Sequence, residues 1–204
     1  RITLERDSLA GGYLKDDHLE VTFRVEDGKV RFLDDLPAVE NGFGQGRLTG
    51  NSFRVQLSRG RFAGWTLTEG LVDFPAFNPR GKDFRVFAKG RGPAQNLMKA
   101  LVESRLEIEF DPTRMSGDGD LTFEMFRPAL NDVPYEDVRF TAVGTVQNAG
   151  LKGAALGFDL AGGTMDVKVD QLGALLTGAA RLGPSPVTFR WYEGFTDEGA
   201  PADL

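Results

Sequence analysis

Hydrophobic and polar residues alternate with a period of two along most of the chain. Apolar residues occupy every second position of Leu19–Val25, with Glu20, Thr22 and Arg24 between them, and of Ser52–Ser58. The alternation recurs in Leu106–Phe110, Leu121–Phe123, Val138–Phe140, Leu156–Leu160, Met165–Val169 and Val187–Trp191. Strands with one apolar and one polar face are typical of an antiparallel sheet that meets water on one side. The pattern therefore predicts a mostly β fold built on a twisted antiparallel sheet.

Short turn signals separate these predicted strands. Each signal pairs glycine or proline with a residue that tolerates a turn conformation. The signals are Asp27-Gly28, Asn41-Gly42, Arg59-Gly60, Asn78-Pro79 and Gly162-Gly163. We expect the chain to reverse direction at these points.

One segment, "GPAQNLMKALVES", has helical rather than strand periodicity. Gly92 suits the N-cap, Pro93 suits the first helical position, and the apolar residues that follow share one helix face. The spacing predicts a single short amphipathic helix over about residues 93–104. The expected role of this helix is to cover one open end of the sheet.

Two stretches of the chain resemble each other. Leu48–Phe62 aligns with Leu151–Met165, with matching leucines and glycines, and "VRF" occurs at both Val30–Phe32 and Val138–Phe140. Such self-similarity indicates a duplicated β-unit of roughly 100 residues. We therefore predict a first repeat unit over 1–110, which includes the helix, a second over 111–195, and a flexible tail over 196–204.

The composition excludes several classes of function. Of 204 residues, 41% are hydrophobic, which is typical of a folded chain, and the net charge is −6. Acidic and basic residues are interspersed, so no basic block favours nucleic acid as a partner. The absence of cysteine rules out thiolate metal sites and disulfides. The chain starts within strand-like sequence, so we expect it to be part of a longer protein.

The glycine-rich stretch "GFGQGRLTGNSFRVQLS" resembles a phosphate-binding loop at first sight. A dinucleotide-binding motif needs a specific glycine spacing followed by a helix. Here the third glycine, Gly50, comes one position late after Gly44 and Gly46, and strand sequence follows. No helix N-terminus is therefore expected there to hold a phosphate. We predict no cofactor, and that these glycines serve bulges, tight turns and strong twist.

Candidate catalytic and metal-ligating residues are few. "SGDGD" supplies Asp118 and Asp120 but lacks the longer oxygen-rich pattern of a calcium loop, so two solvated carboxylates are expected. His18 is the only histidine, which excludes a multi-histidine metal site, and its charged neighbours predict an exposed turn residue. We predict no catalytic residues, no metal site and no enzymatic activity, although the fold could still assemble a constellation that is invisible in sequence.

Several segments, in order, resemble the AsmA-like periplasmic proteins related to YhdP, within the TamB/AsmA superfamily of repeating β-grooves. Val30–Phe74 resembles the family run "LxDLP" followed by "GxGxLxGxxFxVxxxxGxFxGxxLxxGxVxF". Val86–Ser104 resembles the strand that leads into a "GP" helix. Asp111–Pro128, Tyr135–Val146 and Val187–Phe195 also match, although Phe123 and Met125 are bulkier than the family pattern. Each motif is weak alone, and the shared order carries the resemblance across nearly the whole chain.

The resemblance implies a long, twisted, open β-groove made of stacked repeats. Relatives of this kind are anchored in the inner membrane of Gram-negative bacteria, span the periplasm and are implicated in moving phospholipid to the outer membrane. It therefore implies a periplasmic segment of an inner-membrane-anchored parent, with phospholipid or another acyl-chain ligand and further repeats of the parent chain as partners. Acyl chains need apolar contact rather than catalytic groups, which suits the composition.

The groove hypothesis assigns hydrophobic contact to the apolar side chains of the alternating runs. The predicted groove residues are Phe53, Val55, Leu57, Phe62, Phe84, Val86, Leu121, Phe123, Phe140 and Phe158.

Two other functions stay open at this point. In the first, the apolar face is the core of a closed β-sandwich or curved sheet that acts as a non-catalytic scaffold or interaction module in an envelope assembly. In the second and more distant one, the chain is a glycan-acting enzyme on a β-scaffold, with Asp118 or Asp120 taking part in turnover. Lipid binding would separate the groove from both alternatives.

Overall fold

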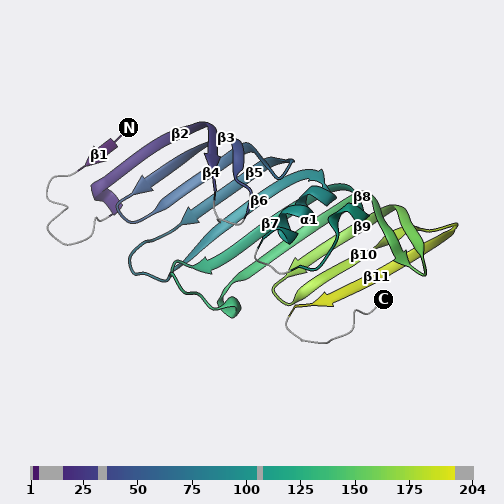
Figure 1. The fold of residues 1–204 in the computed structure, drawn as a ribbon. Coiled ribbons are helices and arrows are strands. Elements are labelled where there is room, and N and C mark those ends of the chain that lie inside the picture. The colour runs from purple at the N-terminus through teal and green to yellow at the C-terminus, as the bar shows by residue number, and fades with distance from the viewer. Residues whose placement is uncertain (1, 5–15, 32–35, 105–107, 196–204) are drawn as a thin grey trace.

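The computed structural model describes residues 2–4, 16–31, 36–104 and 108–195, and they form a single eleven-stranded sheet. The strands follow one another in sequence order from β1 to β11, and every neighbouring pair is antiparallel. The described part of the N-terminus and that of the C-terminus therefore lie at opposite edges of the sheet (Figure 1). The prediction of a mostly antiparallel, open β structure with one short α-helix is confirmed. The predicted tail at 196–204 lies outside the described residues.

Every strand after β1 has ten or more residues. Their bounds are β1 Ile2–Leu4, β2 Leu19–Val30, β3 Val39–Thr49, β4 Phe53–Phe62, β5 Trp65–Phe74, β6 Asp83–Pro93, β7 Met115–Pro128, β8 Arg139–Ala155, β9 Phe158–Asp170, β10 Gly173–Leu182 and β11 Ser185–Gly194. The α-helix α1 spans Ala94–Val102, and the described residues also include 3-10 turns at η2 Asp16–His18, η3 Pro112–Arg114 and η4 Tyr135–Asp137. Ile108–Phe110 are not in a strand, so the strand predicted over Leu106–Phe110 is wrong for these residues, while residues 105–107 lie outside the described ranges.

The register keeps apolar residues together on one face of the sheet. Val86 of β6 pairs with Met125 of β7, which pairs with Phe140 of β8. On the other side of β6, Val86 pairs with Val72 of β5, which pairs with Val55 of β4. Since side chains alternate between faces, residues directly opposite in register lie on the same face. We call this the apolar face, and the opposite side the polar face.

Most of the predicted turns are bulges inside paired strands. Asp27 and Asn41 have positive φ angles of 54° and 49°, and the pairing of β2 with β3 shifts beside them. The side chain of Asn41 donates a hydrogen bond of 2.8 Å to Asp27, which links the two bulges across the strands. The prediction of chain reversal here was wrong because aspartate and asparagine tolerate the left-handed conformation in bulges as well as in turns.

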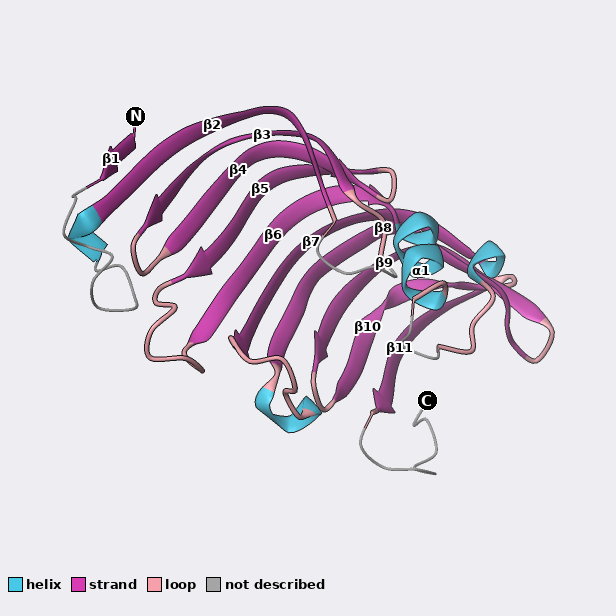
Figure 2. Cartoon of the chain, turned by 60° about the vertical axis from the view of Figure 1, so that its left-hand side comes forward, coloured by secondary structure: helices cyan, strands magenta, loops and turns pink. Residues whose placement is uncertain are grey.

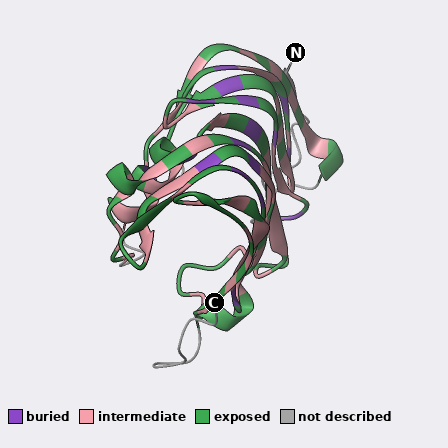
Figure 3. Ribbon diagram, turned by 90° about the vertical axis from the view of Figure 1, so that its right-hand side faces the viewer, coloured by how far each residue is buried: buried purple, intermediate pink, exposed green. Residues whose placement is uncertain are grey.

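The same correction applies further along the sheet. Gly162 has a φ of 66° within β9, and β4 continues through Arg59-Gly60 to Phe62 while its pairing with β3 shifts. Among these signals, Asn78-Pro79 does lie in a connection, between β5 and β6. An extra residue bends its strand, so bulges in successive strands curve the whole sheet. Seen along its length in Figure 3, the sheet is an arch.

The residues beside this bend are the most buried part of the apolar face. Gly42, Gly60, Gly70 and Gly90 are buried there, and the side chain of Leu57 packs against the first three of them. A Cβ atom at Gly70 would lie 3.0 Å from that of Leu57. Glycine removes side-chain bulk where the inner side of a bend becomes crowded. This explains the glycine-rich stretch around Gly44 without any phosphate ligand.

The helix α1 follows β6 directly and returns the chain to β7. Its observed bounds, 94–102, are shorter at both ends than the predicted 93–104, and Pro93 serves as the N-cap. Ala94 packs against the apolar face at Val146, Ala149 and Met165. Figure 2 shows α1 near one end of the strands, and the strands that it contacts most are β7 and β6. The helix therefore covers one end of the apolar face, as predicted.

The sheet runs without interruption through the boundary predicted between the two repeat units. β6 and β7, which precede and follow α1 in the sequence, pair along their length, from Asp83 opposite Pro128 to Pro93 opposite Asp118. Both aligned stretches cover a hairpin, β3–β4 in the first and β8–β9 in the second. Gly60 and Gly163 are buried in both, whereas Leu156, aligned with Phe53, is a turn residue that is 93% exposed. The division into two units therefore stays a prediction.

Candidate functional site: the apolar face

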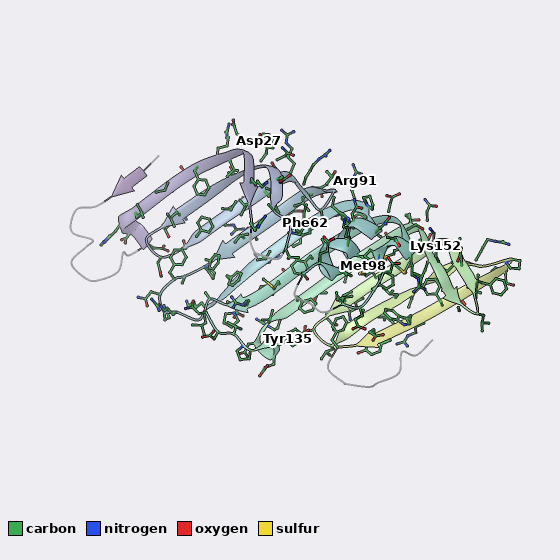
Figure 4. All side chains as sticks on the ribbon, in the orientation of Figure 1. Asp27, Phe62, Arg91, Met98, Tyr135 and Lys152 are labelled. Atoms are coloured by element: carbon green, nitrogen blue, oxygen red, sulfur yellow. The ribbon has the colours of Figure 1, made fainter. Side chains whose placement is uncertain are left out.

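The apolar face brings together nearly all of the predicted groove residues. Phe53, Val55 and Leu57 lie on it in β4, and Phe62 is paired with Trp65 at the end of the same strand. The face continues with Phe84 and Val86 in β6, Leu121 and Phe123 in β7, and Phe140 in β8. Figure 4 shows Phe62 and, on α1, Met98 on the same side of the sheet.

Phe158 is the exception among the predicted residues. It lies at the tip of the β8–β9 hairpin and is 49% exposed. A Cβ atom at Gly183 would lie 2.7 Å from its ring, so Phe158 packs locally against the neighbouring hairpin. The alternation in Leu156–Leu160 predicted that Phe158 lies on the apolar face. The Gly162 bulge and the long β8–β9 hairpin instead place it away from the centre of the sheet.

A row of phenylalanines crosses the uncovered end of the apolar face. We call Phe23, Phe53, Phe74 and Phe84 the phenylalanine row. Successive ring centroids are 6.3, 6.4 and 4.5 Å apart, and the last pair is stacked with an interplanar angle of 13°. Each of these side chains is only half-buried. The rings therefore form an apolar surface that still meets solvent.

Sequence reasoning missed two members of this row and much of the rest of the face. Phe23 and Phe74 were not assigned to it, although Phe23 belongs to the alternating run Leu19–Val25. Trp65, Met125, Met165, Phe189 and Trp191 lie on the apolar face as well. The signal that could have found them is cross-strand register, which follows from the order of neighbouring strands and the positions of bulges.

The apolar face has little covering layer. The chain exposes 13362 Å², whereas a compact monomer of 22.3 kDa exposes about 9,400 Å². Among the described residues, no large side chain is less than 2% exposed. Of the two architectures that the sequence left open, the structure therefore has the single open sheet rather than a closed sandwich.

One part of the face is well packed. Ala94 of α1 with Val146, Ala149 and Met165 forms what we call the covered cluster, in which the residues are 3–8% exposed. Trp65, beside it, is 4% exposed and donates a 2.8 Å hydrogen bond from its indole nitrogen to the carbonyl of Pro93. The tryptophan lies over Gly92 and Gly119, where any Cβ atom would come within 3 Å of its ring. The glycines thus create the space that the indole fills.

The polar face is held by cross-strand ion pairs. Arg85 contacts Glu124 at 2.6 Å, Lys29 contacts Glu40 at 2.6 Å, and Arg47 contacts Glu20 at 3.2 Å. These side chains are mostly exposed, so each pair contributes roughly 0–1 kcal/mol to stability. A shallow depression of about 640 Å³ lies among the long side chains on this face and is bordered by Arg24, Gln45, Arg54, Gln56, Arg85 and Phe87.

The candidate catalytic carboxylates are dispersed. Asp118 and Asp120 lie in β7, not in a loop, and both are exposed on the polar face. The pKa of Asp111 is lowered because the hydroxyl and backbone N–H of Thr113 donate hydrogen bonds to its carboxylate, at 2.7 and 2.9 Å. Within the ranges that the structure describes, no three histidine or acidic side chains converge on a point that could hold a metal ion.

His18 is in a turn, as predicted, but it is not exposed. Its side chain is 22% accessible, and its Nδ1 atom is buried without a hydrogen-bond partner among the described residues. The nearby hydroxyls of Thr49 and Ser52 bond to each other at 2.6 Å, and that of Thr49 also bonds to Asp16. The prediction of exposure failed because η2 folds back against β2 and β3.

Comparisons with known proteins add no relative. The chain has no significant match to a protein-family model, a curated protein or a solved structure. In the part of the chain that the structure describes, no helix has the length and apolar character to cross a membrane.

Proposed function

We propose that this chain is a segment of a lipid-transport protein of the cell envelope, in which the apolar face of the open sheet holds acyl chains. The observation that carries the proposal is the continuous, half-exposed apolar face. It extends from Phe23 in β2 to Trp191 in β11 with a covering helix at one end only. Exposed apolar surfaces of this extent are typical of binding sites.

The dimensions of the face suit acyl chains. From β2 to β11 there are nine spacings between strands, and at about 4.8 Å each they give a path of roughly 43 Å along the face. One leaflet of a membrane has a hydrocarbon thickness of about 15 Å, half of the ~30 Å core. The face is therefore long enough for an acyl chain to lie at several successive positions. Each fully buried methylene contributes roughly 0.8 kcal/mol, so binding needs no specific polar group.

The proposal places the chain in the periplasm, as part of an inner-membrane-anchored parent of the AsmA-like, YhdP-related type. The order of motifs from Val30 to Phe195 supports this family assignment. The open antiparallel sheet agrees with the groove that the resemblance implies. In this proposal the side chains act by apolar contact, the protein is not an enzyme, and no cofactor takes part.

Native mass spectrometry after incubation with phospholipid vesicles tests the proposal. We expect bound phospholipid on the protein, and its loss in Phe53→Asp and Phe123→Asp. The matched controls Gln56→Asp and Thr122→Asp introduce the same charge on the polar face of the same strands and are expected to keep the lipid. Circular dichroism and urea unfolding verify that each variant is folded.

The result that would overturn the proposal is a folded protein that excludes labelled phospholipid. Equal loss of lipid in the polar-face controls would also contradict it, because binding would then not depend on the apolar face. If the face instead captures a protein from the same assembly and excludes lipid, the scaffold alternative replaces the groove. Turnover of a glycan that depends on Asp118 or Asp120 would establish the enzyme alternative.

A further inference from the structure

The outer edge of β11 presents main-chain hydrogen-bonding groups. In the order of the described strands β11 is last, and its one neighbour is β10. The backbone N–H of Phe195 points toward β10, since it bonds to the carbonyl of Leu172 at 3.0 Å. Successive N–H groups alternate between the two sides of a strand. Those of Thr188, Arg190 and Tyr192 therefore point away from β10, toward the edge.

The sequence of β11 repeats that of β2. Val187–Gly194 reads "VTFRWYEG", and Val21–Gly28 reads "VTFRVEDG". Both segments are strands, and their phenylalanines, Phe189 and Phe23, both point to the apolar face. The match is closer than that between the two aligned hairpins. It makes β11 the counterpart of β2, which would end the second predicted unit before β11 rather than at residue 195.

β2 shows which kind of strand pairs with this sequence. Its partner β3 places Gly46 opposite Phe23 and Leu48 opposite Val21. A Cβ atom at Gly46 would lie 2.1 Å from the Phe23 ring, so the ring occupies the space above the glycine. A larger residue at this position would displace the ring.

In β7, too, the phenylalanine has small residues opposite it, here in both neighbouring strands. Its sequence Leu121-Thr122-Phe123 resembles the start of the β2 motif, and Phe123 lies between Ala88 of β6 and Ala142 of β8. Phe189 of β11 has Gly178 of β10 on its paired side, where a Cβ atom would lie 3.1 Å from the ring. Small residues thus flank the phenylalanine of this motif wherever the neighbouring strand is present.

We propose that the β11 edge binds an extended segment of the β3 type, with glycine or alanine opposite Phe189, supplied by a further repeat unit. Pairing would use the outward N–H groups of Thr188, Arg190 and Tyr192. Pro186 occupies the next position that faces the edge, but proline has no N–H to donate. The sequence of residues 196–204, "TDEGAPADL", lacks the alternation that such a strand requires. The inference is independent of whether the apolar face holds lipid.

The test uses the protein of residues 1–204 and a synthetic peptide of β3, Val39–Thr49. Nuclear magnetic resonance titration gives the peptide Kd, and amide hydrogen exchange is then measured with the peptide at ten times this Kd. We expect exchange at Thr188, Arg190 and Tyr192 to slow about tenfold, because only the free protein exchanges there. The amides of Phe189 and Trp191, already directed at β10, serve as internal references.

Two matched controls make the test specific. A peptide with Gly46→Val keeps length and charge but fills the space needed by the Phe189 ring, and is expected to bind at least about tenfold more weakly. In the protein, Thr188→Pro removes an outward N–H that β10 does not use, and is expected to abolish binding, whereas Thr188→Ala keeps it.

Other outcomes contradict the proposal. Unchanged exchange at these three amides, or equal slowing by the valine peptide, would show that the edge does not select a β3-type strand. Peptide-induced changes confined to β2, β3 and β4 would mean exchange with the native β3 strand. Protection without peptide that grows with protein concentration, together with a dimer mass, would assign the edge to a second copy of the chain.

Discussion

The two ends of strand β5 carry large aromatic side chains on the same face of the sheet but in different surroundings. Trp65, at its start, is 4% exposed and bonds to the carbonyl of Pro93, the N-cap of α1. Phe74, at its end, is half-buried and stacks on Phe84 with ring centroids 4.5 Å apart. The alternation in the sequence is the same at both ends, so it is the helix that distinguishes them.

This difference separates stability from binding. The covered cluster beside Trp65 holds four of the eight buried hydrophobic residues in the described ranges, whereas the phenylalanine row leaves apolar surface in contact with water. A single-layer sheet is marginal unless at least one part of it is covered. We infer that α1 supports the fold at one end and that the other end is thereby free to contact a ligand.

The largest expected effect comes from placing a charge at each end. Val146→Asp buries an unpaired carboxylate at a position that is 3% exposed, and we expect a loss of at least about 4 kcal/mol in the free energy of unfolding. Phe53→Asp places the charge in the half-exposed row, where we expect a loss of about 1–2 kcal/mol. Urea unfolding of both variants measures the contrast, and equal losses would mean that α1 does not distinguish the two ends.

A matched pair of glycine substitutions sharpens the contrast with less disturbance. In Gly119→Ala the new methyl group would lie 2.5 Å from the indole of Trp65, which is buried and hydrogen-bonded, so we expect a loss of about 2 kcal/mol. In Gly46→Ala it would meet the end of the Phe23 ring, which can move toward solvent, so we expect less than about 1 kcal/mol. Thermal unfolding compares them, and a larger loss at Gly46 would show that the row is rigid.

The fold class and most of the apolar face could be predicted from period-two alternation alone. Residues such as Phe53, Leu121 and Phe140 reach one face because strand geometry fixes the direction of every second side chain. The helix was predictable too, since Pro93 and the apolar stripe after it are strong local signals. These features depend only on neighbours in sequence.

The bend and the phenylalanine row could not be predicted in the same way. Asp27-Gly28 and Asn41-Gly42 have the composition of hairpin turns, and only pairing between β2 and β3 shows that they are bulges. The contact of Phe74 with Phe84 depends on the length of the connection between β5 and β6 and on the register that it sets. The burial of His18 likewise depends on how η2 packs on strands distant in sequence.

A double-mutant cycle measures how far the row acts as a unit. We expect Phe74→Leu and Phe84→Leu to show a coupling free energy of about 1 kcal/mol, because their rings are stacked at 4.5 Å. The control cycle pairs Phe23→Leu with Phe84→Leu, whose rings are separated by two others of the row, and is expected to be additive within about 0.5 kcal/mol. Coupling in the control as large as in the stacked pair would indicate a row that rearranges as a whole.

The smallest expected effect is a pH dependence at the covered end. Hydrogen bonds from Thr113 favour the charged form of Asp111 and lower its pKa, so the stabilisation is present above the unfolded pKa of about 3.9 and is lost as pH falls through the lower folded value. Because Asp111 begins η3, which contacts α1, loosening at acidic pH should affect amides of α1 before those of the phenylalanine row. Thr113→Ala should raise the Asp111 pKa, as read from its carboxyl carbon by nuclear magnetic resonance. An unchanged pKa in this variant would rule out the Thr113 hydroxyl as a cause, and simultaneous loosening of both ends would rule out a local effect on the covered end.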